Sequence, residues 1–498
     1  MADKIPLTDE SKGRLPHPLI ALLPVAVLVG MMSLMISLFG SDALGGGTQI
    51  ALLLASAVCI SISMAVYHTQ WKSFEKGIVD TVSSSVVSLC ILLIIGMMSS
   101  SWMVSGVVPT LIYYGVQILS PTYYLGCTCF ICAVVSVMTG SSWTTVATIG
   151  VALIGIGSAL GIPVYWSAGA IISGAYFGDK ISPLSDTTVL ASSVAEVNLF
   201  THIRYMLQTT VPSMVITLII FFIAGFCFQS DGDVRIREYT EHLGSTFNIS
   251  LWTLVVPVLT GVMIARRVPS LITLFVSSLL AGVMAFVLQH NILIDIANGG
   301  DALVADGRSV SMCVKGVLMT FFTSTNIDTG SQTVNDLVAT NGMAGMLNTI
   351  WLILCAMCFG GAMVASGMLQ SITRVIIRAI RGTTSLVTST VCSGLLSNIL
   401  TCDQYISIIL TISMFKKAYQ EKGYEGRLLS RTTEDSTTVT SVLIPWNTCG
   451  MTQSTVLGVP TLVYLPFCFF NYISPLMSII VSSIKVKPKQ HETTTPHL

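Results

Sequence analysis

Residues 81–178 begin with TVSSSVVSLCILLIIGMMSS at Thr81 and continue to Gly178 without an Asp, Glu, Lys or Arg. A helix that crosses a membrane needs about 20 predominantly apolar residues, so this stretch has room for roughly four or five spans. A second uncharged stretch, from Ser436 to Ile484, has room for roughly two more. The pattern predicts an all-α, polytopic helical membrane protein.

The composition of the whole chain agrees with this prediction. Of 498 residues, 52% are hydrophobic and 10% are charged, whereas a soluble domain has about 25% charged residues. The 24 basic and 24 acidic residues balance, so the chain has no net charge that would attract nucleic acid. These values exclude a soluble enzyme and a nucleic-acid-binding protein. The metalloprotease motif H-E-x-x-H and the ATP-binding motif G-x-x-x-x-G-K-[ST] are both absent from the sequence.

Basic residues indicate the orientation, because Lys and Arg favour cytoplasmic loops. The cytoplasmic side fits the basic residues Lys72, Arg266, Arg378 and Lys485. The outside fits the stretch 291–306, which contains three acidic residues and no Lys or Arg. We therefore expect both termini in the cytoplasm of a multi-pass cell (inner) membrane protein, with an even number of full spans, about ten to twelve, plus half-spans. The expected parts are a cytoplasmic segment (1–18), a first membrane half (19–228), central spans and loops (229–345), a second half (346–484) and a cytoplasmic tail (485–498).

Two short motifs recur on either side of the polar centre, where Asp231–His242 and Asn291–Asn341 are predicted to be loops. SDTTV at Ser185 resembles DSTTV at Asp435, and small polar residues interrupt apolar sequence at Thr139–Ser142 and at Asn398–Thr401. The order of these motifs predicts two internal repeats. Interrupted segments in corresponding positions of two halves indicate the binding site of a transporter.

Asp403 is the only charge in the apolar stretch Gly382–Phe415. A carboxylate at this depth is costly and usually faces a polar pathway, which favours a functional role. The alternative is a structural acid that is hydrogen-bonded within a helix contact.

A longer motif runs from Gly174 to Thr188, and Pro183 predicts a break in its helix. Broken backbone at membrane depth is tolerated where it lines a cavity, and its carbonyl groups can then bind a cation. Oxygen atoms of Asp179 and Asp186 and of neighbouring hydroxyl groups would complete a site for a hard cation such as Na⁺. The alternative is an interfacial loop with helix-capping residues.

The third segment, Arg431–Ser441, contains Glu434 and Asp435 and precedes a second break at Pro445. These acids can be charges at a helix N-terminus, which the helix dipole would favour. Their resemblance to the Asp186 segment favours the hypothesis that both segments face one cavity.

These segments together predict a site at which Na⁺ and H⁺ compete, because burial raises the pKa of a carboxylate toward neutral pH. The carboxylates expected to exchange ions are Asp179, Asp186, Asp403, Glu434 and Asp435. The side chains expected to surround the cation are Thr139, Ser141, Ser142, Asp179, Ser182, Ser185, Asp186, Thr187, Asn398, Thr401, Asp403, Asp435, Ser436 and Thr437. No cofactor is expected besides the transported ions.

The same motifs resemble those of the NhaC-type Na⁺/H⁺ antiporter family. The similar pieces are TGSSW at Thr139–Trp143, SGAYFGDKISPLSDTT at Ser173–Thr188, LSRTTEDSTTVTS at Leu429–Ser441 and PWNTCG at Pro445–Gly450. The resemblance implies a secondary transporter in the lipid bilayer, with two inverted-topology repeats and a homodimeric assembly, that exchanges Na⁺ for H⁺. Related members resemble malate/lactate exchangers, so a coupled carrier of a small organic acid or amino acid is the alternative. Discontinuous repeats favour alternating access, although the sequence does not exclude a channel.

Overall fold

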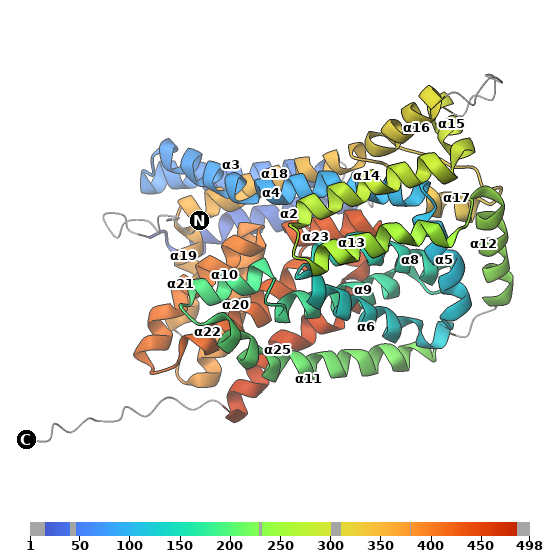
Figure 1. Cartoon of the computed structure of the whole chain (residues 1–498). Helices are drawn as coiled ribbons and strands as arrows, with labels where there is room; N and C mark the ends of the chain where they lie inside the picture. Colours follow the sequence, from blue (N-terminus) through green and yellow to red (C-terminus); the bar gives the residue numbers. More distant parts are fainter. Residues whose placement is uncertain (1–14, 40–45, 229–231, 300–309, 379, 486–498) are drawn as a thin grey trace, which may run out of the picture.

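The computed structural model describes residues 15–39, 46–228, 232–299, 310–378 and 380–485. Within these ranges the regular structure is helical, and the β-type pairing is one isolated antiparallel bridge between Thr325 and Thr340. The long helices lie side by side along one axis (Figure 1). The predicted all-α class is confirmed.

In chain order, the helices before residue 229 are called the first half, those between 229 and 343 the central part and the later ones the second half. The first half contains α1 (Pro18–Ala21), α2 (Leu23–Phe39), α3 (Gly47–Tyr67), α4 (Trp71–Val104), α5 (Val107–Ile118), α6 (Pro121–Thr139), α7 (Ser142–Thr145), the π-helix η2 (Val146–Gly150), α8 (Val151–Ala159), α9 (Val164–Ile181), α10 (Asp186–Val194) and α11 (Leu199–Gly225). The central part contains α12 (Gly232–Thr246), the 3-10 helix η3 (Leu251–Leu254), α13 (Val255–Ala265), α14 (Ser270–Leu288), α15 (His290–Asn298), α16 (Val310–Phe322) and α17 (Gln332–Val338). The second half contains the 3-10 helix η4 (Ala344–Met346), α18 (Leu347–Ala365), α19 (Met368–Arg378), α20 (Thr383–Thr401), α21 (Gln404–Glu421), α22 (Gly426–Thr433), the π-helix η5 (Glu434–Thr438), the 3-10 helix η6 (Ser441–Leu443), α23 (Thr448–Leu457), α24 (Thr461–Tyr464), the 3-10 helix η7 (Leu465–Phe467) and α25 (Phe469–Lys485).

Many of these helices suit a membrane. Among the described residues, 8 helices are long and apolar enough to cross it, or up to 10 if each of two bent pairs forms one span. The bent pairs cover Ile236–Ala265 and Thr461–Ser483. The chain is therefore a multi-pass membrane protein, and only the larger count reaches the predicted ten to twelve spans.

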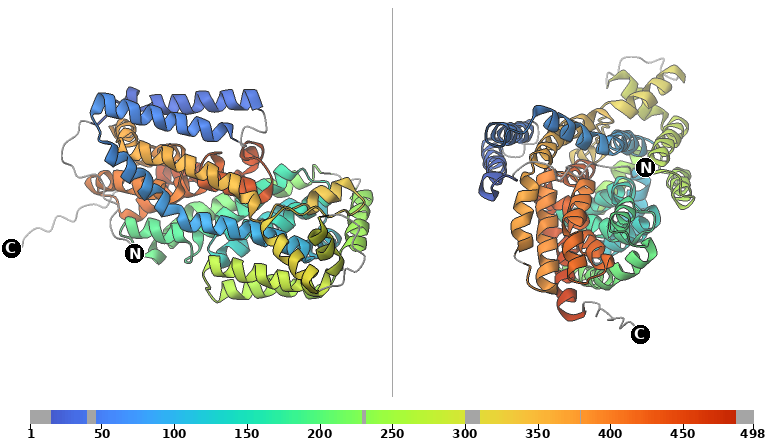
Figure 2. Two further views of the ribbon diagram at one scale, coloured as in Figure 1. Left: turned by 90° about the horizontal axis from the view of Figure 1, so that it is seen from above. Right: turned by 90° about the vertical axis from the view of Figure 1, so that its left-hand side faces the viewer.

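The first and central helices flank the rest of the bundle. Figure 2 shows α2 and α3 (blue) along one edge and the helices around α14–α16 (yellow-green) along another. α2 and α3 pack against each other, and α3 also packs against α18 of the second half. The halves are thus in direct contact rather than separate bodies.

The two predicted central loops contain helices, which corrects that prediction. α12 covers Gly232–Thr246, and α15, α16 and α17 occupy most of the described part of 291–341; Asp231 and residues 300–309 lie outside the described residues. α12 is amphipathic, since Tyr239 and Leu243 are buried four residues apart while Glu241 is exposed. A polar helix of this kind has low overall hydropathy and needs only one apolar face.

Helix breaks occur near the predicted positions. α6 ends before Gly140, which has a φ of 66°, and α20 ends before Cys402, which has a φ of 59°. The next residue of each break, Ser141 or Asp403, is extended and caps the following helix with its side chain. The apolar stretch Gly382–Phe415 is therefore two helices, with its break at 402–403 rather than at 398–401.

Elements of the first half recur in the second half with a shift of 262 residues. α6 (Pro121–Thr139) corresponds to α20 (Thr383–Thr401), and the helical run 142–159 corresponds to α21, which spans 404–421. The breaks at Pro183 and Pro445 are separated by the same number. Thr139 and Thr401 also make equivalent bonds, to Thr145 Oγ1 at 3.1 Å and to Ser407 Oγ at 2.7 Å.

This register differs from the one suggested by the sequence motifs. SDTTV at Ser185 begins after a break and enters α10, whereas DSTTV at Asp435 lies before a break, inside the π-helix η5. A shift of 262 pairs Ser185 with Asn447, and each caps the helix that follows it. Helix bounds and caps therefore correspond at a shift of 262 residues, but the two similar motifs occupy different places in that correspondence.

α6 and α9 approach closely because glycines line their contact. A Cβ atom at Gly174 would lie 2.1 Å from the carbonyl oxygen of Cys129, and one at Gly178 would lie 2.5 Å from that of Ala133. Both distances are far shorter than van der Waals contact, so larger residues would push the helices apart. This packing fixes the last turn of α9, which carries Asp179.

Candidate cation site

A small cavity of about 50 Å³ lies between the first helix break of the first half, at Gly140, and that of the second half, at Asp403. Its lining comes from α4, the α6–α7 break, the α9–α10 region, the start of α14 and the start of α21. These residues are Ser88, Ile91, Gly140, Ser141, Trp143, Asp179, Asp186, Thr187, Ser270, Gln404 and Tyr405. The lining contains two carboxylates and several hydroxyl groups, and no Lys, Arg or His.

Asp179 is the most strongly held carboxylate of this cavity. Its Oδ2 atom accepts hydrogen bonds from the backbone N–H of Ser142 at 3.1 Å and from the Ser142 hydroxyl at 2.7 Å. Its Oδ1 atom accepts a bond from the Ser185 hydroxyl at 2.6 Å. Asp179 thus joins α9 to both adjacent helix breaks.

Asp186 is the first residue of α10 and is exposed, so it marks the side on which the cavity meets the surface. Its neighbour Thr187 is buried, and the hydroxyl oxygens of Thr187 and Ser185 lie 3.0 Å apart. Ser141 lines the cavity and caps α7 by accepting a bond from the N–H of Thr144 at 3.2 Å. The predicted residues of the first half therefore lie together.

Asp403 occupies the equivalent break in the second half. Its Oδ1 atom accepts a bond from the N–H of Ile406 at 3.0 Å, and its Oδ2 atom accepts bonds from Ser85 at 3.2 Å and Thr448 at 3.4 Å. It is 2% exposed and does not itself line the cavity. The next two residues of α21, Gln404 and Tyr405, do line it, so Asp403 lies directly behind the cavity wall.

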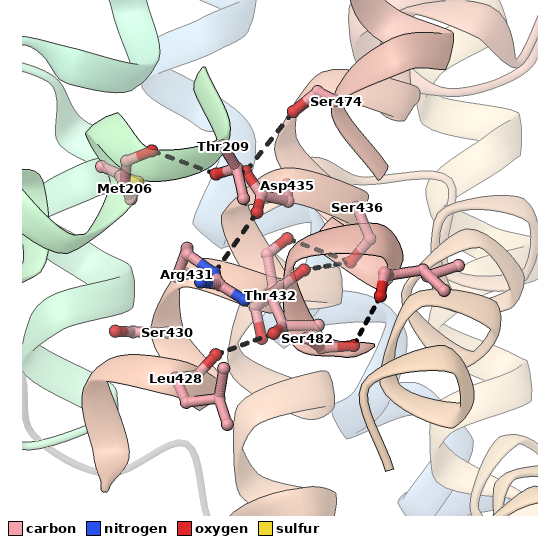
Figure 3. A network of polar contacts seen from close by, with 12 residues as sticks. Met206, Thr209, Leu428, Ser430, Arg431, Thr432, Asp435, Ser436, Ser474 and Ser482 are labelled. Carbon is pink, nitrogen blue, oxygen red and sulfur yellow. Dashed lines mark hydrogen bonds and ion pairs between the residues drawn. The ribbon is translucent and has the colours of Figure 1, made fainter. Parts of the chain in front are cut away.

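Asp435 belongs to a different cluster. It is fully buried and forms an ion pair with Lys180, and its Oδ1 atom also accepts a bond from Thr209 at 3.0 Å. Arg431 Nε lies 3.7 Å from Asp435 Oδ2, and its guanidinium group stands 4.8 Å from the centre of the Tyr205 ring. Figure 3 shows Asp435 between Thr209, Ser474 and Arg431.

The expected shared cavity is therefore not present in this conformation. Asp186 lines the small cavity, whereas Glu434 and Asp435 are buried in and beside the ion-pair cluster and do not line it. Glu434 and Asp435 precede the break at Pro445, and they lie within a continuous helical segment that packs on α20 and α25 rather than at a helix N-terminus.

Three other predicted ligands bond to the backbone. Ser182 donates to the carbonyl oxygen of Val137 at 2.8 Å, and Ser436 donates to that of Thr432 at 2.7 Å. Asn398 donates to the carbonyl oxygen of Thr437 at 2.6 Å. These bonds join helices or stabilise a helix, and none of the three side chains lines the small cavity.

Comparison with known proteins identifies the family. A family model described as the Na⁺/H⁺ antiporter family matches residues 15–193 and 174–484. The chain belongs to this family. The Na(+)/H(+) antiporter NhaC of Bacillus subtilis is 33% identical over 435 residues, which cover 87% of this chain and 92% of that protein.

Other antiporter relatives differ in what their names say they exchange. The malate-2H(+)/Na(+)-lactate antiporter of Bacillus subtilis is 35% identical over 434 residues, 87% of this chain and 88% of that protein. The arginine/ornithine antiporter ArcD of Halobacterium salinarum is 33% identical over 465 residues, 93% of this chain and 90% of that protein. The family is thus one of transporters rather than enzymes, and its members differ in substrate.

Sequence reasoning missed residues of both the small cavity and the ion-pair cluster. Lys180 was not among the predicted site residues, but it is fully buried against Asp435 and Ser474. Gln404 and Tyr405 line the cavity because they directly follow the break at Asp403. One signal for Lys180 was available, since it lies within the long motif that predicted the site.

The oxygen atoms of the small cavity suit a hard monovalent cation. Carboxylate, hydroxyl and carbonyl oxygens are the ligands that such ions prefer. The break at Gly140 leaves backbone groups of α6 without a continuing helix, as in other broken-helix sites. The small cavity therefore brings together the kinds of oxygen atom that a cation site needs.

Proposed function

We propose that the protein exchanges Na⁺ for H⁺ across the cell membrane by alternating access. The observation that carries the proposal is the small cavity, which contains Asp179 and Asp186, hydroxyl groups and no basic side chain. Family membership and the NhaC relatives support the same activity.

Asp179 is the carboxylate that alternates between the two ions in this proposal. When it is ionised, its negative charge and the oxygen atoms of Ser141 and Thr187 bind Na⁺. When it is protonated, the charge that attracts Na⁺ is gone, and the ion leaves. Ser142 and Ser185 hold the carboxylate in place in both states, because their hydroxyl groups rotate to donate or accept a hydrogen bond.

Asp403 is a second candidate for the exchanged proton. It lies behind Gln404 and Tyr405 and is held by three donors, as Asp179 is. Asp435 has a different role in the proposal, because the nearby Lys180 already compensates its charge. It organises α9 against the second half.

Transport in proteoliposomes tests this function. External Na⁺ should dissipate a preset pH gradient in vesicles that contain the purified protein, and K⁺ should do so poorly. A protein that moves no protons in response to Na⁺, with or without an organic acid, does not have this function.

The alternative is Na⁺- or H⁺-coupled exchange of a small organic acid or amino acid. The malate/lactate and arginine/ornithine relatives favour it. The lining of the small cavity contains no basic side chain, so a carboxylate substrate there would depend on the coupling cation or proton to compensate its charge. Adding malate, lactate, arginine or ornithine to the same vesicles distinguishes the alternatives, since a true substrate accelerates the Na⁺-dependent proton flux.

The assembly and orientation are further parts of the proposal. We propose a homodimer with both termini in the cytoplasm and two membrane halves, 19–228 and 346–484, of inverted topology. Residues 1–18 and 485–498 are then cytoplasmic, and 229–345 form the central spans. Cross-linking of the protein in native membranes tests the dimer.

A further inference from the structure

A second, larger cavity lies farther along the same helices. Its volume is about 590 Å³, and α4, α8, α23 and the segment 332–342 line it. Gln332, Thr333 and Asp336 are both exposed and part of this lining, so they form its mouth. The Gly342 N–H donates a bond to the Ser100 hydroxyl at 2.9 Å, which attaches this segment to α4.

One face of α4 borders both cavities. Ser88 and Ile91 line the small cavity, and Ile95 and Ser99 line the large one. These positions are three or four residues apart, so they lie on the same side of the helix. Ile91 and Ile95 are separated by about 6 Å along the helix axis, which is roughly one turn.

The opposite wall has the same arrangement. Trp143 of α7 lines the small cavity, and Val151, Ile154 and Ser158 of α8 line the large one. The π-helix η2 lies between them in sequence, and it packs against α4. Short π-helical segments are frequent at functional sites, because their extra residue per turn makes them easy to rearrange.

We propose that the two cavities are the two ends of one cation pathway, which is closed in this conformation by Ile91 and Ile95 of α4 packed against η2. This inference rests on the proposed function and adds the position of its barrier. The barrier is thin, because one turn of α4 carries both of its isoleucines. A small shift of α4 relative to η2 is enough to transfer access from one cavity to the other.

The charges along the pathway select the transported ion. Its acidic lining residues are Asp179 and Asp186 in the small cavity and Asp336 in the large one, and neither lining contains Lys, Arg or His. The large cavity has room for a hydrated cation. The ion would lose water when it passes the barrier and reaches the oxygen atoms around Asp179.

Substituting the barrier residues tests the proposal through passive leak. Ile95→Ala and Ile91→Ala open space in the barrier, and we expect both to raise the passive entry of radioactive Na⁺ into vesicles, without a pH gradient, at least several-fold. The matched control is Val87→Ala on the same helix, since Val87 is 63% exposed and lines neither cavity. It should leave the leak at the wild-type level.

A blocking variant covers the case in which Ile95→Ala does not fold. Ser99→Trp fills the large cavity next to the barrier and should reduce Na⁺/H⁺ exchange at least tenfold. Na⁺ should still bind in the small cavity of this variant and raise the melting temperature of the protein as it does for the wild type. Normal exchange by Ser99→Trp, or wild-type leak in both isoleucine variants that fold, would overturn the pathway. Failure of the wild type to exchange Na⁺ for H⁺ would instead reject the proposed function, and the leak measurement would still report on the barrier.

Discussion

Asp179 and Lys180 are neighbours in the chain but belong to different clusters. Successive residues of a helix point about 100° apart, so one turn of α9 can serve two environments. Asp179 bonds to Ser142 and Ser185 at the cavity, whereas Lys180 pairs with Asp435 of the second half. The last turn of α9 therefore contacts both the small cavity and the ion-pair cluster of the second half.

Replacing Asp179 tests its role as the exchanging carboxylate. Asp179→Asn keeps the size of the side chain and most of its hydrogen bonds but removes the negative charge and the titratable proton. We expect Na⁺-driven proton flux to fall below detection, while the folded yield stays near the wild-type level. The control is Glu241→Gln, an exposed acid on α12 that should transport normally. Full flux in Asp179→Asn would transfer the role to Asp403.

The ion-pair cluster predicts an asymmetry between two single substitutions. Lys180→Met leaves Asp435 with Arg431, whose Nε atom is 3.7 Å away. Asp435→Asn instead leaves two buried cations without a carboxylate partner, and an unpaired buried charge costs about 3–5 kcal/mol. We therefore expect Asp435→Asn to lower the melting temperature in detergent more than Lys180→Met does.

The double variant Lys180→Met with Asp435→Leu tests how much the ion pair of this cluster contributes to stability. Replacement of Lys180 and Asp435 by apolar residues of similar volume leaves only Arg431 unpaired, whereas Asp435→Asn leaves both Lys180 and Arg431 unpaired, so the double variant should be the more stable of the two. A double variant that is less stable than Asp435→Asn alone would show that the ion pair is not the dominant interaction.

At the scale of elements, the two equivalent breaks predict unequal effects of substitution. Gly140 and Cys402 both have a left-handed backbone, with φ values of 66° and 59°. A Cβ atom at Gly140 would lie 2.6 Å from the Cβ of Leu184, so Gly140→Ala adds a clash to an unfavourable backbone. Cys402→Gly removes a conformational cost of about 1 kcal/mol, which offsets part of the loss of its fully buried side chain.

We therefore expect Gly140→Ala to lower both stability and exchange, and Cys402→Gly to keep exchange with a smaller loss of thermal stability than Gly140→Ala. Thermal unfolding and proton flux measured on the same purified samples check both expectations. Wild-type stability and proton flux in Gly140→Ala would contradict this expectation, and would mean that the backbone at Gly140 can change its conformation without cost.

Hydropathy and helix-breaking residues predicted most of this architecture. The uncharged stretch 81–178 gave several helices, and Gly140, Pro183 and Pro445 lie at or within breaks. The central helices α12, α15, α16 and α17 lie in segments that were predicted to be loops. For α12 the reason is that a polar helix at the surface needs only a narrow apolar face, which Tyr239 and Leu243 provide.

The composition of the site was harder to predict than its location. Local motifs identified Asp179, Ser142 and Ser185, which lie within about 45 positions of one another in the sequence and contact each other directly. Lys180 and Asp435 are 255 residues apart, so only the packing of the halves shows their pairing. The similarity of SDTTV and DSTTV was misleading because short Ser/Thr-rich matches carry no information about register.

At the scale of the whole molecule, the two cavities differ greatly in size. The large cavity has a volume of about 590 Å³ and the small one about 50 Å³. The large cavity opens beside α17, and Figure 1 shows α12, α15 and α17 at the end of the bundle opposite α19 and α22. This conformation is therefore more open at the end that carries α17.

The distribution of basic residues gives this end an orientation. Arg374, Arg378 and Arg427 lie on α19 and α22, and Lys72 begins α4. Because basic residues favour the cytoplasm, the end with α19 and α22 should be cytoplasmic and the large cavity should open outward. The orientation predicted from the sequence also rested on Asp301 and on the two chain ends. These lie outside the described residues, so an experimental test of the orientation needs other positions.

Lys72→Cys and Thr333→Cys, each in a background without other cysteines, provide that test. Both residues are exposed, one at the start of α4 and the other on α17 at the mouth of the large cavity. An impermeant thiol reagent added to intact cells should label Cys at 333 and leave Cys at 72 unlabelled until the membrane is opened. The physical reason is that α4 is a span of 34 residues, about 50 Å long, and the large cavity lies near its far end. Labelling of both positions from the same side would contradict the orientation and, with it, the outward opening of the large cavity.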